Sequence, residues 1–140
     1  MTVLFDTNVV LDVLLEREPH VLPAARLFSL ADSGHIRGAI CSTTATTIYS
    51  IAAKTVGVRK AREQVRNLLG IFDIAPVNKH ILLAALDAEF SDHEDAVLHE
   101  AARAISADAI ATRDRTGFTK ATIPALDPRE LLAFIATSTK

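Results

Sequence analysis

Short apolar runs alternate along this chain with longer segments in which apolar residues recur every three or four positions. The short runs predict strands that are apolar on both faces, as strands covered by helices on both sides must be. The longer segments predict amphipathic helices, because positions such as Val58, Ala61 and Val65 share one side of a helix. We expect strands at Thr2–Phe5, Ala39–Cys41, Phe72–Val77, Ala109–Thr112 and Ile123–Leu126. We expect helices near 8–16, 22–33, 44–55, 59–70, 79–89, 94–105 and 129–137.

Residues at the expected helix ends agree with this pattern. Asp127-Pro128-Arg129-Glu130 is typical of a helix start, with an N-cap acid, proline in the first turn and a capping-box glutamate. Ser33-Gly34 is typical of a helix end. The regular alternation of strand and helix predicts an α/β fold with a mostly parallel sheet of about five strands and helices on both faces. The 140 residues suit a single domain spanning 1–140.

Composition narrows the class of protein. The single cysteine, Cys41, excludes an internal disulfide and a multi-cysteine zinc site. No run of 18 apolar residues occurs and no signal peptide is visible, so we expect no membrane span and a cytoplasmic location. The net charge of −2 does not favour nucleic-acid binding by the whole surface. A polyanionic partner would have to be held by a local patch or through a metal ion.

Three aspartates stand at the ends of expected elements. Asp6 and Asp114 follow strands directly, and ligands of such sheets bind beyond the carboxyl ends of the strands. Asp95 precedes Ala96-Val97-Leu98, where the expected helix turns inward. Each acid also has a structural interpretation: Asp6 as a helix cap, Asp92 and Glu94 as cap and dipole partners of the next helix, and Asp114 as a turn acid paired with Arg113 or Arg115. Asp108 precedes its strand and is expected at the opposite end of the sheet.

Convergence of Asp6, Asp95 and Asp114 would create a strongly anionic pocket. Carboxylates brought together in a partly dry cleft repel one another. Mg²⁺ or Mn²⁺ removes that repulsion and prefers oxygen ligands. Such an ion can activate water, orient a phosphate and stabilise a leaving oxygen, so the pattern favours hydrolysis of a phosphodiester.

Four motifs in this order and spacing resemble the PIN-domain nucleases, closest in pattern to the VapC-like toxins of toxin–antitoxin pairs. They are Phe5-Asp6-Thr7-Asn8, Ser42-Thr43-Thr44-Ala45-Thr46-Thr47, Asp92-His93-Glu94-Asp95-Ala96 and Thr112-Arg113-Asp114. The resemblance implies a three-layer α/β/α sandwich and Mg²⁺- or Mn²⁺-dependent cleavage of single-stranded RNA. It also implies a possible antitoxin partner and a homodimer, for which the helices near 22–33 and 44–55 could supply a surface.

The resemblance also implies roles for individual residues. Asp6, Asp95 and Asp114 match the first, third and fourth acids of the family, which bind the metal. Asn8 matches the polar residue beside the first acid, and Thr112 matches the small hydroxyl residue near the metal.

One acid of the family is missing. The second acid should lie on the helix after the second strand, and Thr47 holds that place, with Thr46 beside it. A hydroxyl can bind a metal-bound water but adds no negative charge, so metal affinity should be lower. Asp92, one helical turn before Asp95, could compensate as a further ligand. The alternative is a catalytically weakened or inactive RNA- or protein-binding module.

Candidate RNA contacts are few. Arg59, Arg62 and Arg66 share a helix face that could contact phosphates, although a solvated face explains the same spacing. Arg113 and Arg115 flank Asp114 and are better placed to meet the scissile phosphate, unless Arg113 pairs with an acid. Phe118 is the only phenylalanine we expect to be exposed. The five histidines show no zinc spacing and are expected at the surface or in caps.

Overall fold

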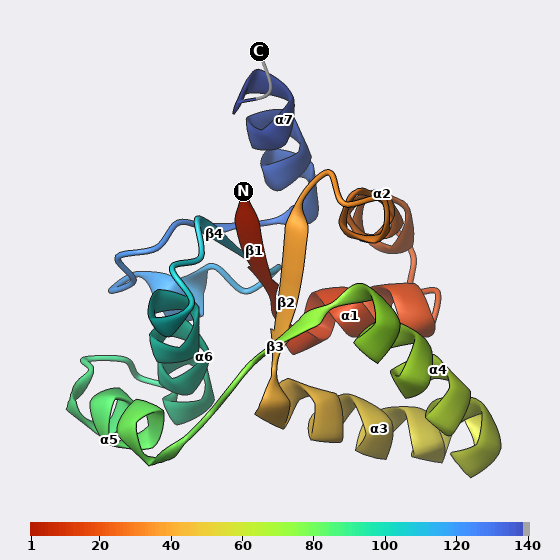
Figure 1. Ribbon diagram of the computed structural model, residues 1–140, viewed down its shortest axis with the longest axis horizontal. Coiled ribbons are helices and arrows are strands. Elements are labelled where there is room, and N and C mark those ends of the chain that lie inside the picture. The colour runs from red at the N-terminus through yellow and green to blue at the C-terminus, as the bar shows by residue number, and fades with distance from the viewer. Residues whose placement is uncertain (139–140) are drawn as a thin grey trace.

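The computed structural model describes residues 1–138 and contains one parallel sheet of five strands. The strand order is β3-β2-β1-β4-β5, so the N-terminal strand lies in the middle (Figure 1). The central strand is paired in register with both neighbours, Val3 opposite Gly38 on one side and Ala109 on the other. The strands are β1 (Thr2–Phe5), β2 (Arg37–Cys41), β3 (Asp73–Ala75), β4 (Ala109–Ala111) and β5 (Ala125–Leu126).

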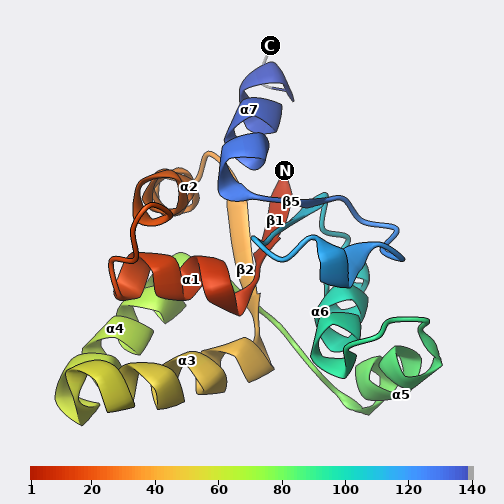
Figure 2. The same ribbon diagram turned by 180° about the vertical axis from the view of Figure 1, so that it is seen from behind.

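Helices cover both faces of the sheet and complete a three-layer α/β/α sandwich. Figure 2 shows α1 to α4 on one side of the strands and α5 and α6 on the other, with α7 near the chain's N-terminus. A short 3₁₀ helix, η1 (Thr116–Phe118), follows β4. The helices are α1 (Thr7–Leu14), α2 (Val21–Asp32), α3 (Ser42–Val56), α4 (Val58–Ile71), α5 (Lys79–Asp87), α6 (His93–Ala104) and α7 (Pro128–Ser138).

The alternation of side chains along β1 divides the interior into two cores. Val3 and Phe5 point to the core formed with α1, α2 and α7, and Leu4 points to the core formed with α5 and α6. All three side chains are fully buried. Successive residues of a strand face opposite sides of a sheet, so a central strand must be apolar throughout. The sequence pattern of this strand is thereby explained.

A cluster of three aromatic rings fixes the first core. Phe5, Phe28 and Phe72 meet edge to face, with centroids 4.9 to 5.8 Å apart. Gly38 on β2 makes room for this cluster, because a Cβ atom there would stand 2.8 Å from the ring of Phe72. The absence of a side chain at Gly38 therefore allows the Phe72 ring to pack closely against the sheet.

The predicted elements are confirmed, with ends displaced by a few residues. β3, for example, is confined to Asp73–Ala75 at the edge of the sheet. The capping box at α7 is also confirmed, since Asp127 accepts the N–H of Glu130 at 2.9 Å and Glu130 accepts that of Asp127 at 3.1 Å. None of the described helices has the length and apolar character needed to cross a membrane.

Three predictions about single residues are wrong. Phe134 of α7, which was not expected to be exposed, is 43% exposed. Phe118 is buried at 5% exposure, because η1 folds back onto the second core and brings its ring 6.0 Å from that of Phe90. His99 is buried at 3% exposure rather than at the surface. Its ring stacks on Phe90, and its Nε2 accepts the N–H of Thr122 at 3.0 Å, so it is a satisfied core histidine.

Candidate functional site

The acidic residues gather in a cleft at the carboxyl ends of β1 and β4. Because Phe5 pairs with Ala111 across these parallel strands, the residues that follow them, Asp6 and Thr112, leave the sheet side by side. The first turn of α6 brings Asp95 to the same cleft. The cleft has a volume of about 530 Å³. Its polar lining includes Asp6, Thr7, Asn8, Arg17, Thr43, Thr44, Thr47, His93, Glu94, Asp95, Arg113 and Asp114.

Three groups hold the Asp6 carboxylate in a fixed orientation. The backbone N–H of Thr7 donates to Oδ1 at 2.7 Å, and the hydroxyl of Thr112 donates to Oδ2 at 2.7 Å. Asn8 contributes a longer contact of 3.5 Å to Oδ2. Asp6 is therefore the N-cap of α1 and a cleft acid at once, which unites its two sequence interpretations.

Thr112 links the first acid to the last. It is fully buried, and its Oγ1 accepts the N–H of Asp114 at 3.1 Å while donating to Asp6. The Asp114 carboxylate then accepts the Thr116 hydroxyl at 2.7 Å. Asn8 spans the same gap, because its Oδ1 accepts the N–H of Arg113 at 3.2 Å.

The acids of the cleft oppose one another's ionisation. Burial raises the pKa of Asp6, the Thr112 and Thr7 hydrogen bonds oppose this rise, and the charges of Asp114 and Glu94 add to it. Burial, followed by the charges of Asp92, Asp6, Asp114 and Glu94, raises the pKa of Asp95 to about 6. At neutral pH the cleft holds unbalanced negative charge, which a cation would relieve.

Gly117 of η1 is in contact with two of the acids. A Cβ atom at this position would overlap the Asp95 carboxylate and would lie 3.4 Å from Oδ2 of Asp114. Both carboxylates therefore lie next to the same backbone position. We did not identify Gly117 from the sequence, and its only signal was a glycine three residues after Asp114.

A buried aspartate holds two arginines at the rim of the cleft. Asp12 is fully buried on α1; its Oδ1 accepts Nε of Arg17 at 2.9 Å and its Oδ2 accepts Nε of Arg113 at 2.6 Å. Nη2 of Arg113 adds a second bond to Oδ1 at 3.1 Å, and Nη2 of Arg17 donates to the carbonyl of Asn8 at 3.1 Å. One carboxylate and two guanidinium groups leave a net positive charge beside the acids.

The remaining predicted residues lie in different places. Thr47 lines the cleft, but its hydroxyl donates to the Thr43 carbonyl at 3.1 Å. Asp92 caps α6 by accepting the N–H of Asp95 at 3.0 Å. Arg115 pairs with Glu130 at 2.8 Å. Neither Asp92 nor Arg115 lines the cleft.

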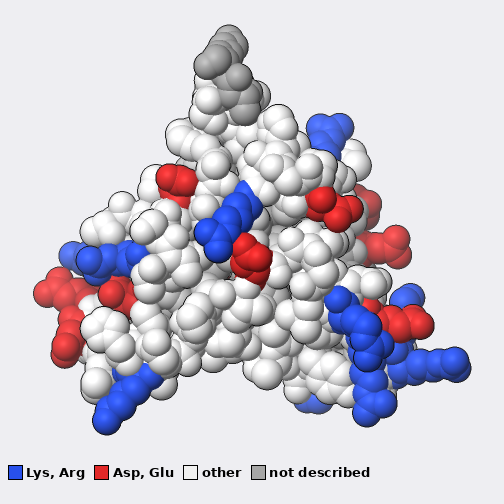
Figure 3. All heavy atoms as spheres, viewed as in Figure 1, with Lys and Arg blue, Asp and Glu red and all other residues white. Residues whose placement is uncertain are grey.

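The α4 strip, defined as Arg59, Arg62 and Arg66, also lies outside the cleft. Figure 3 shows Lys and Arg side chains gathered over α4, at the lower right of the view. All three arginines are exposed. Their role in RNA binding stays a prediction.

The chemistry of the cleft suits a hard divalent cation. Asp6, Asp95, Asp114 and the nearby Glu94 supply carboxylate oxygens, the donors that Mg²⁺ and Mn²⁺ prefer. Burial and the charges of neighbouring acids raise the pKa of Asp95, so a cation would be favourable there. Within residues 1–138, however, no three His, Cys, Asp or Glu side chains are close enough together to form a complete metal site. The donors fit the ion in type and charge, and the carboxylates would have to draw closer to share it.

The family follows from a comparison of the sequence with protein-family models. Residues 2–116 match the model described as PIN domain. The chain belongs to the PIN-domain family. A comparison of this PIN domain with curated proteins gives no significant match.

Solved structures with the same fold include toxin–antitoxin complexes. The PIN domain is similar to a toxin–antitoxin complex from Klebsiella pneumoniae, with 22% sequence identity over 90% of this chain and 97% of that chain and a TM-score of 0.67. VapBC2 from Rickettsia felis, bound to a DNA fragment from its promoter, has 14% identity over 91% and 98% of the two chains and a TM-score of 0.69. FitAcB from Neisseria gonorrhoeae has 19% identity over 91% and 98% and a TM-score of 0.67. At these identities the likeness confirms the fold.

Proposed function

We propose that this PIN-domain protein is a metal-dependent endoribonuclease that hydrolyses phosphodiester bonds of single-stranded RNA. The observation that carries the proposal is the meeting of acids from β1, α6 and the loop after β4 in one cleft. Burial, with the charges of neighbouring acids adding to it, raises the pKa values of Asp6 and Asp95, so a cation in the cleft would be favourable. When bound, Mg²⁺ or Mn²⁺ would activate water and neutralise charge on the phosphoryl oxygens.

Individual residues in and around the cleft have distinct roles in this proposal. Asp6, Asp95 and Asp114 would hold the ion. Thr112 and Asn8 orient Asp6 by the hydrogen bonds described above. Arg17 and Arg113, fixed by Asp12, present guanidinium groups to a substrate phosphate.

A second candidate function is an RNA- or protein-binding module with weak or no catalysis. Its support lies on α3, where Thr46 and Thr47 both donate to the Thr43 carbonyl, at 2.9 and 3.1 Å. No carboxylate from α3 reaches the cleft, since Thr43, Thr44 and Thr47 are the residues of α3 that line it. Metal affinity is expected to be correspondingly lower.

Cleavage of end-labelled, mixed-sequence single-stranded RNA separates the two functions. We expect cleavage by the purified protein in Mg²⁺ or Mn²⁺ and none in EDTA, with activity restored when the cation is returned. Equal cleavage in EDTA would contradict metal dependence. RNA binding without cleavage in either cation would favour the second function.

The substitution Gly117→Ala is expected to lower the cleavage rate about ten- to hundred-fold, because its Cβ displaces the Asp95 carboxylate from its position. Gly70→Ala is the matched control, since a Cβ added there meets no atom within 4 Å. Initial cleavage rates and thermal melting temperatures should be measured for both variants. Unchanged cleavage by Gly117→Ala, at an unchanged melting temperature, would show that Asp95 does not need this position.

We further propose that the protein is the toxin of a cytoplasmic toxin–antitoxin pair and forms a homodimer. The support is its similarity to solved toxin–antitoxin complexes. Exposed leucines also suit a protein partner: Leu82, Leu83 and Leu86 of α5 are 43%, 53% and 69% exposed. On the helices that we expected to supply a dimer surface, Leu22 of α2 is 61% exposed and Ile51 of α3 is 37% exposed.

A further inference from the structure

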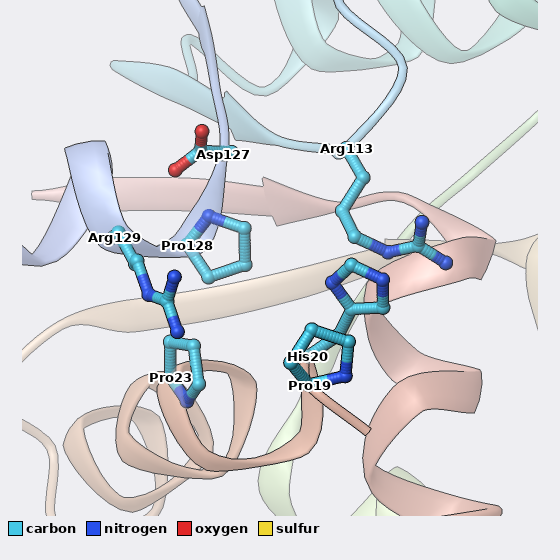
Figure 4. Close-up of a pocket in the computed structure, with 7 residues that line it drawn as sticks. All are labelled: Pro19, His20, Pro23, Arg113, Asp127, Pro128 and Arg129. Atoms are coloured by element: carbon cyan, nitrogen blue, oxygen red, sulfur yellow. The ribbon is translucent and has the colours of Figure 1, made fainter. Parts of the chain in front are cut away.

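A second cavity lies beside the acidic cleft and shares one wall with it. This proline pocket, of about 290 Å³, is lined by Pro19, His20, Pro23, Arg113, Asp127, Pro128 and Arg129. Arg113 also lines the cleft, so the two spaces adjoin at this residue. Figure 4 shows Arg113 and Arg129 on opposite sides of the pocket, with the His20 ring beside Arg113.

A third cavity continues the line of pockets away from the acids. It has a volume of about 320 Å³ and is lined by Leu22, Pro23, Arg26, Arg129 and Leu132, between α2 and α7. Pro23 and Arg129 are shared with the proline pocket. Each cavity therefore shares a residue with the next, from the cleft to the surface between α2 and α7.

Each of these three cavities is lined by at least one arginine. Arg17 and Arg113 stand at the cleft, Arg129 between the second and third cavities, and Arg26 in the third. Arg26 and Arg129 are exposed, and within residues 1–138 neither forms an ion pair. A guanidinium group without a carboxylate partner keeps its full capacity to bind a phosphate.

One acid also faces the path. Asp127 lines the proline pocket, but its Oδ1 accepts the N–H of Glu130 as the cap of α7. Figure 4 shows its carboxylate pointing away from Pro19 and His20. The flat surfaces of the pocket come from three prolines and one imidazole.

We propose that these cavities form a track for the part of a single-stranded RNA that flanks the scissile phosphate. The proposal rests on the ribonuclease function proposed above and adds to it the place of the flanking nucleotides. Phosphates would meet Arg113, Arg129 and Arg26 in turn. A base would stack on the His20 imidazole beside the prolines, because stacking on aromatic side chains accompanies backbone contacts in single-strand binding. The proline pocket, near the lower end of the about 300–1,000 Å³ typical of small-molecule sites, suits one nucleotide.

The test compares two double variants that remove the same charge. Arg26→Ala/Arg129→Ala removes two cations from the track, and Arg59→Ala/Arg62→Ala removes two from the α4 strip. Binding of a labelled oligouridine of about ten nucleotides, a length within single-strand site sizes, is measured by fluorescence polarisation. EDTA prevents cleavage, and the salt concentration is varied.

We expect the track variant to bind at least about ten-fold more weakly at low salt. The slope of log K against log salt should fall by about 1.4, since each phosphate contact on a single strand contributes about 0.7. The α4 variant tests the α4 strip as an alternative phosphate contact, and it should lose less affinity than the track variant. In Mg²⁺ the track variant should cleave with a raised KM and an unchanged kcat, because its arginines lie outside the catalytic cleft.

The contribution of bases is tested separately. His20→Ala should weaken oligouridine binding about five-fold, the lower end of the effect of removing one stacking partner. It should not change the binding of an abasic oligomer of equal length. If His20→Ala weakens the binding of both oligomers equally, no base stacks on His20, and that part of the proposed track is overturned.

The outcomes separate the track from the ribonuclease function. If the wild type cleaves RNA but both double variants bind equally, whether weakened or not, the track is overturned and the function stands. If the wild type binds RNA without cleaving it and only the track variant loses affinity, the track is supported and the function fails. Absence of RNA binding by the wild type overturns both.

Discussion

Asp6→Asn should abolish metal-dependent RNA cleavage and leave the fold intact. Asparagine is as good an N-cap as aspartate, because its side-chain oxygen can still accept the N–H of Thr7. Its Nδ2 then takes the place of the oxygen that accepts the Thr112 hydroxyl, so that hydroxyl has to reorient. The negative charge and the acceptor of the Thr112 hydroxyl are lost, while the cap of α1 is kept. Loss of one carboxylate ligand should reduce the cleavage rate at least about a hundred-fold, which corresponds to about 2.7 kcal/mol of transition-state stabilisation.

The stability of this variant gives an independent readout. Burial and neighbouring acids raise the pKa of Asp6, so its charge is unfavourable in the metal-free fold. Asp6→Asn should therefore melt at the wild-type temperature or higher without metal, and should gain less stability from added Mn²⁺. Asp108→Asn is the matched control, because Asp108 caps the opposite end of the sheet by accepting the N–H of Thr2 at 2.8 Å. Cleavage by Asp6→Asn at the rate of this control would exclude Asp6 as a catalytic residue.

Asp12→Ala should destabilise the protein by about 3–5 kcal/mol, the usual cost of removing one partner of a buried ion pair. Asp12 is fully buried and binds both Arg17 and Arg113, so its loss leaves two guanidinium groups without their counter-ion. Their mutual repulsion should also displace Arg113 from the rim of the cleft. The free energy of unfolding in urea measures the first effect, and the KM for RNA measures the second.

An exposed ion pair provides the comparison for Asp12. Arg37 and Asp73 pair at 2.6 Å, but their side chains are 63% and 56% exposed. Exposed pairs contribute about 0–1 kcal/mol, so Asp73→Ala should cost about 1 kcal/mol or less. If Asp12→Ala and Asp73→Ala lower the free energy of unfolding by similar amounts, burial does not strengthen the ion pairs of Asp12.

The fold and half of the cleft could be predicted from local sequence patterns. Strand–helix alternation specified a parallel sheet, and in such sheets the residues after the strands share one edge. Asp6 and Asp114 follow β1 and β4, so their common location could be predicted once the strands were recognised. Asp108, which precedes β4, was correctly expected at the other end.

The arginine network could not be predicted in the same way. Asp12 lies within an apolar helix pattern, and its partners are 5 and 101 residues away in the chain. Helical spacing alone does not show that Asp12 faces the interior. This orientation follows only once it is known which face of α1 packs against the core. The sequence offered Asp114 as the partner of Arg113, and packing of the loop after β4 against α1 selected Asp12 instead.

The burial of Phe118 and the role of Gly117 depend on tertiary structure. Both belong to η1, a single short turn in a segment that carries no periodic pattern. The turn places Phe118 in the second core and Gly117 against Asp95 and Asp114. From the sequence, this buried turn could therefore not be distinguished from an exposed loop that contains one apolar residue.

The central position of β1 divides the acidic site into a stiff half and an adjustable half. Asp6 leaves a strand that is paired on both sides and buried on both faces, so it cannot shift without the whole sheet. Asp95 begins a helix that follows an exposed connection, and Asp114 belongs to a loop. If the carboxylates close around an ion as proposed, Asp6 would stay in place while α6 and η1 would move toward it. Binding of an ion is therefore expected to move the segments around 88–95 and 113–118 before it moves Asp6.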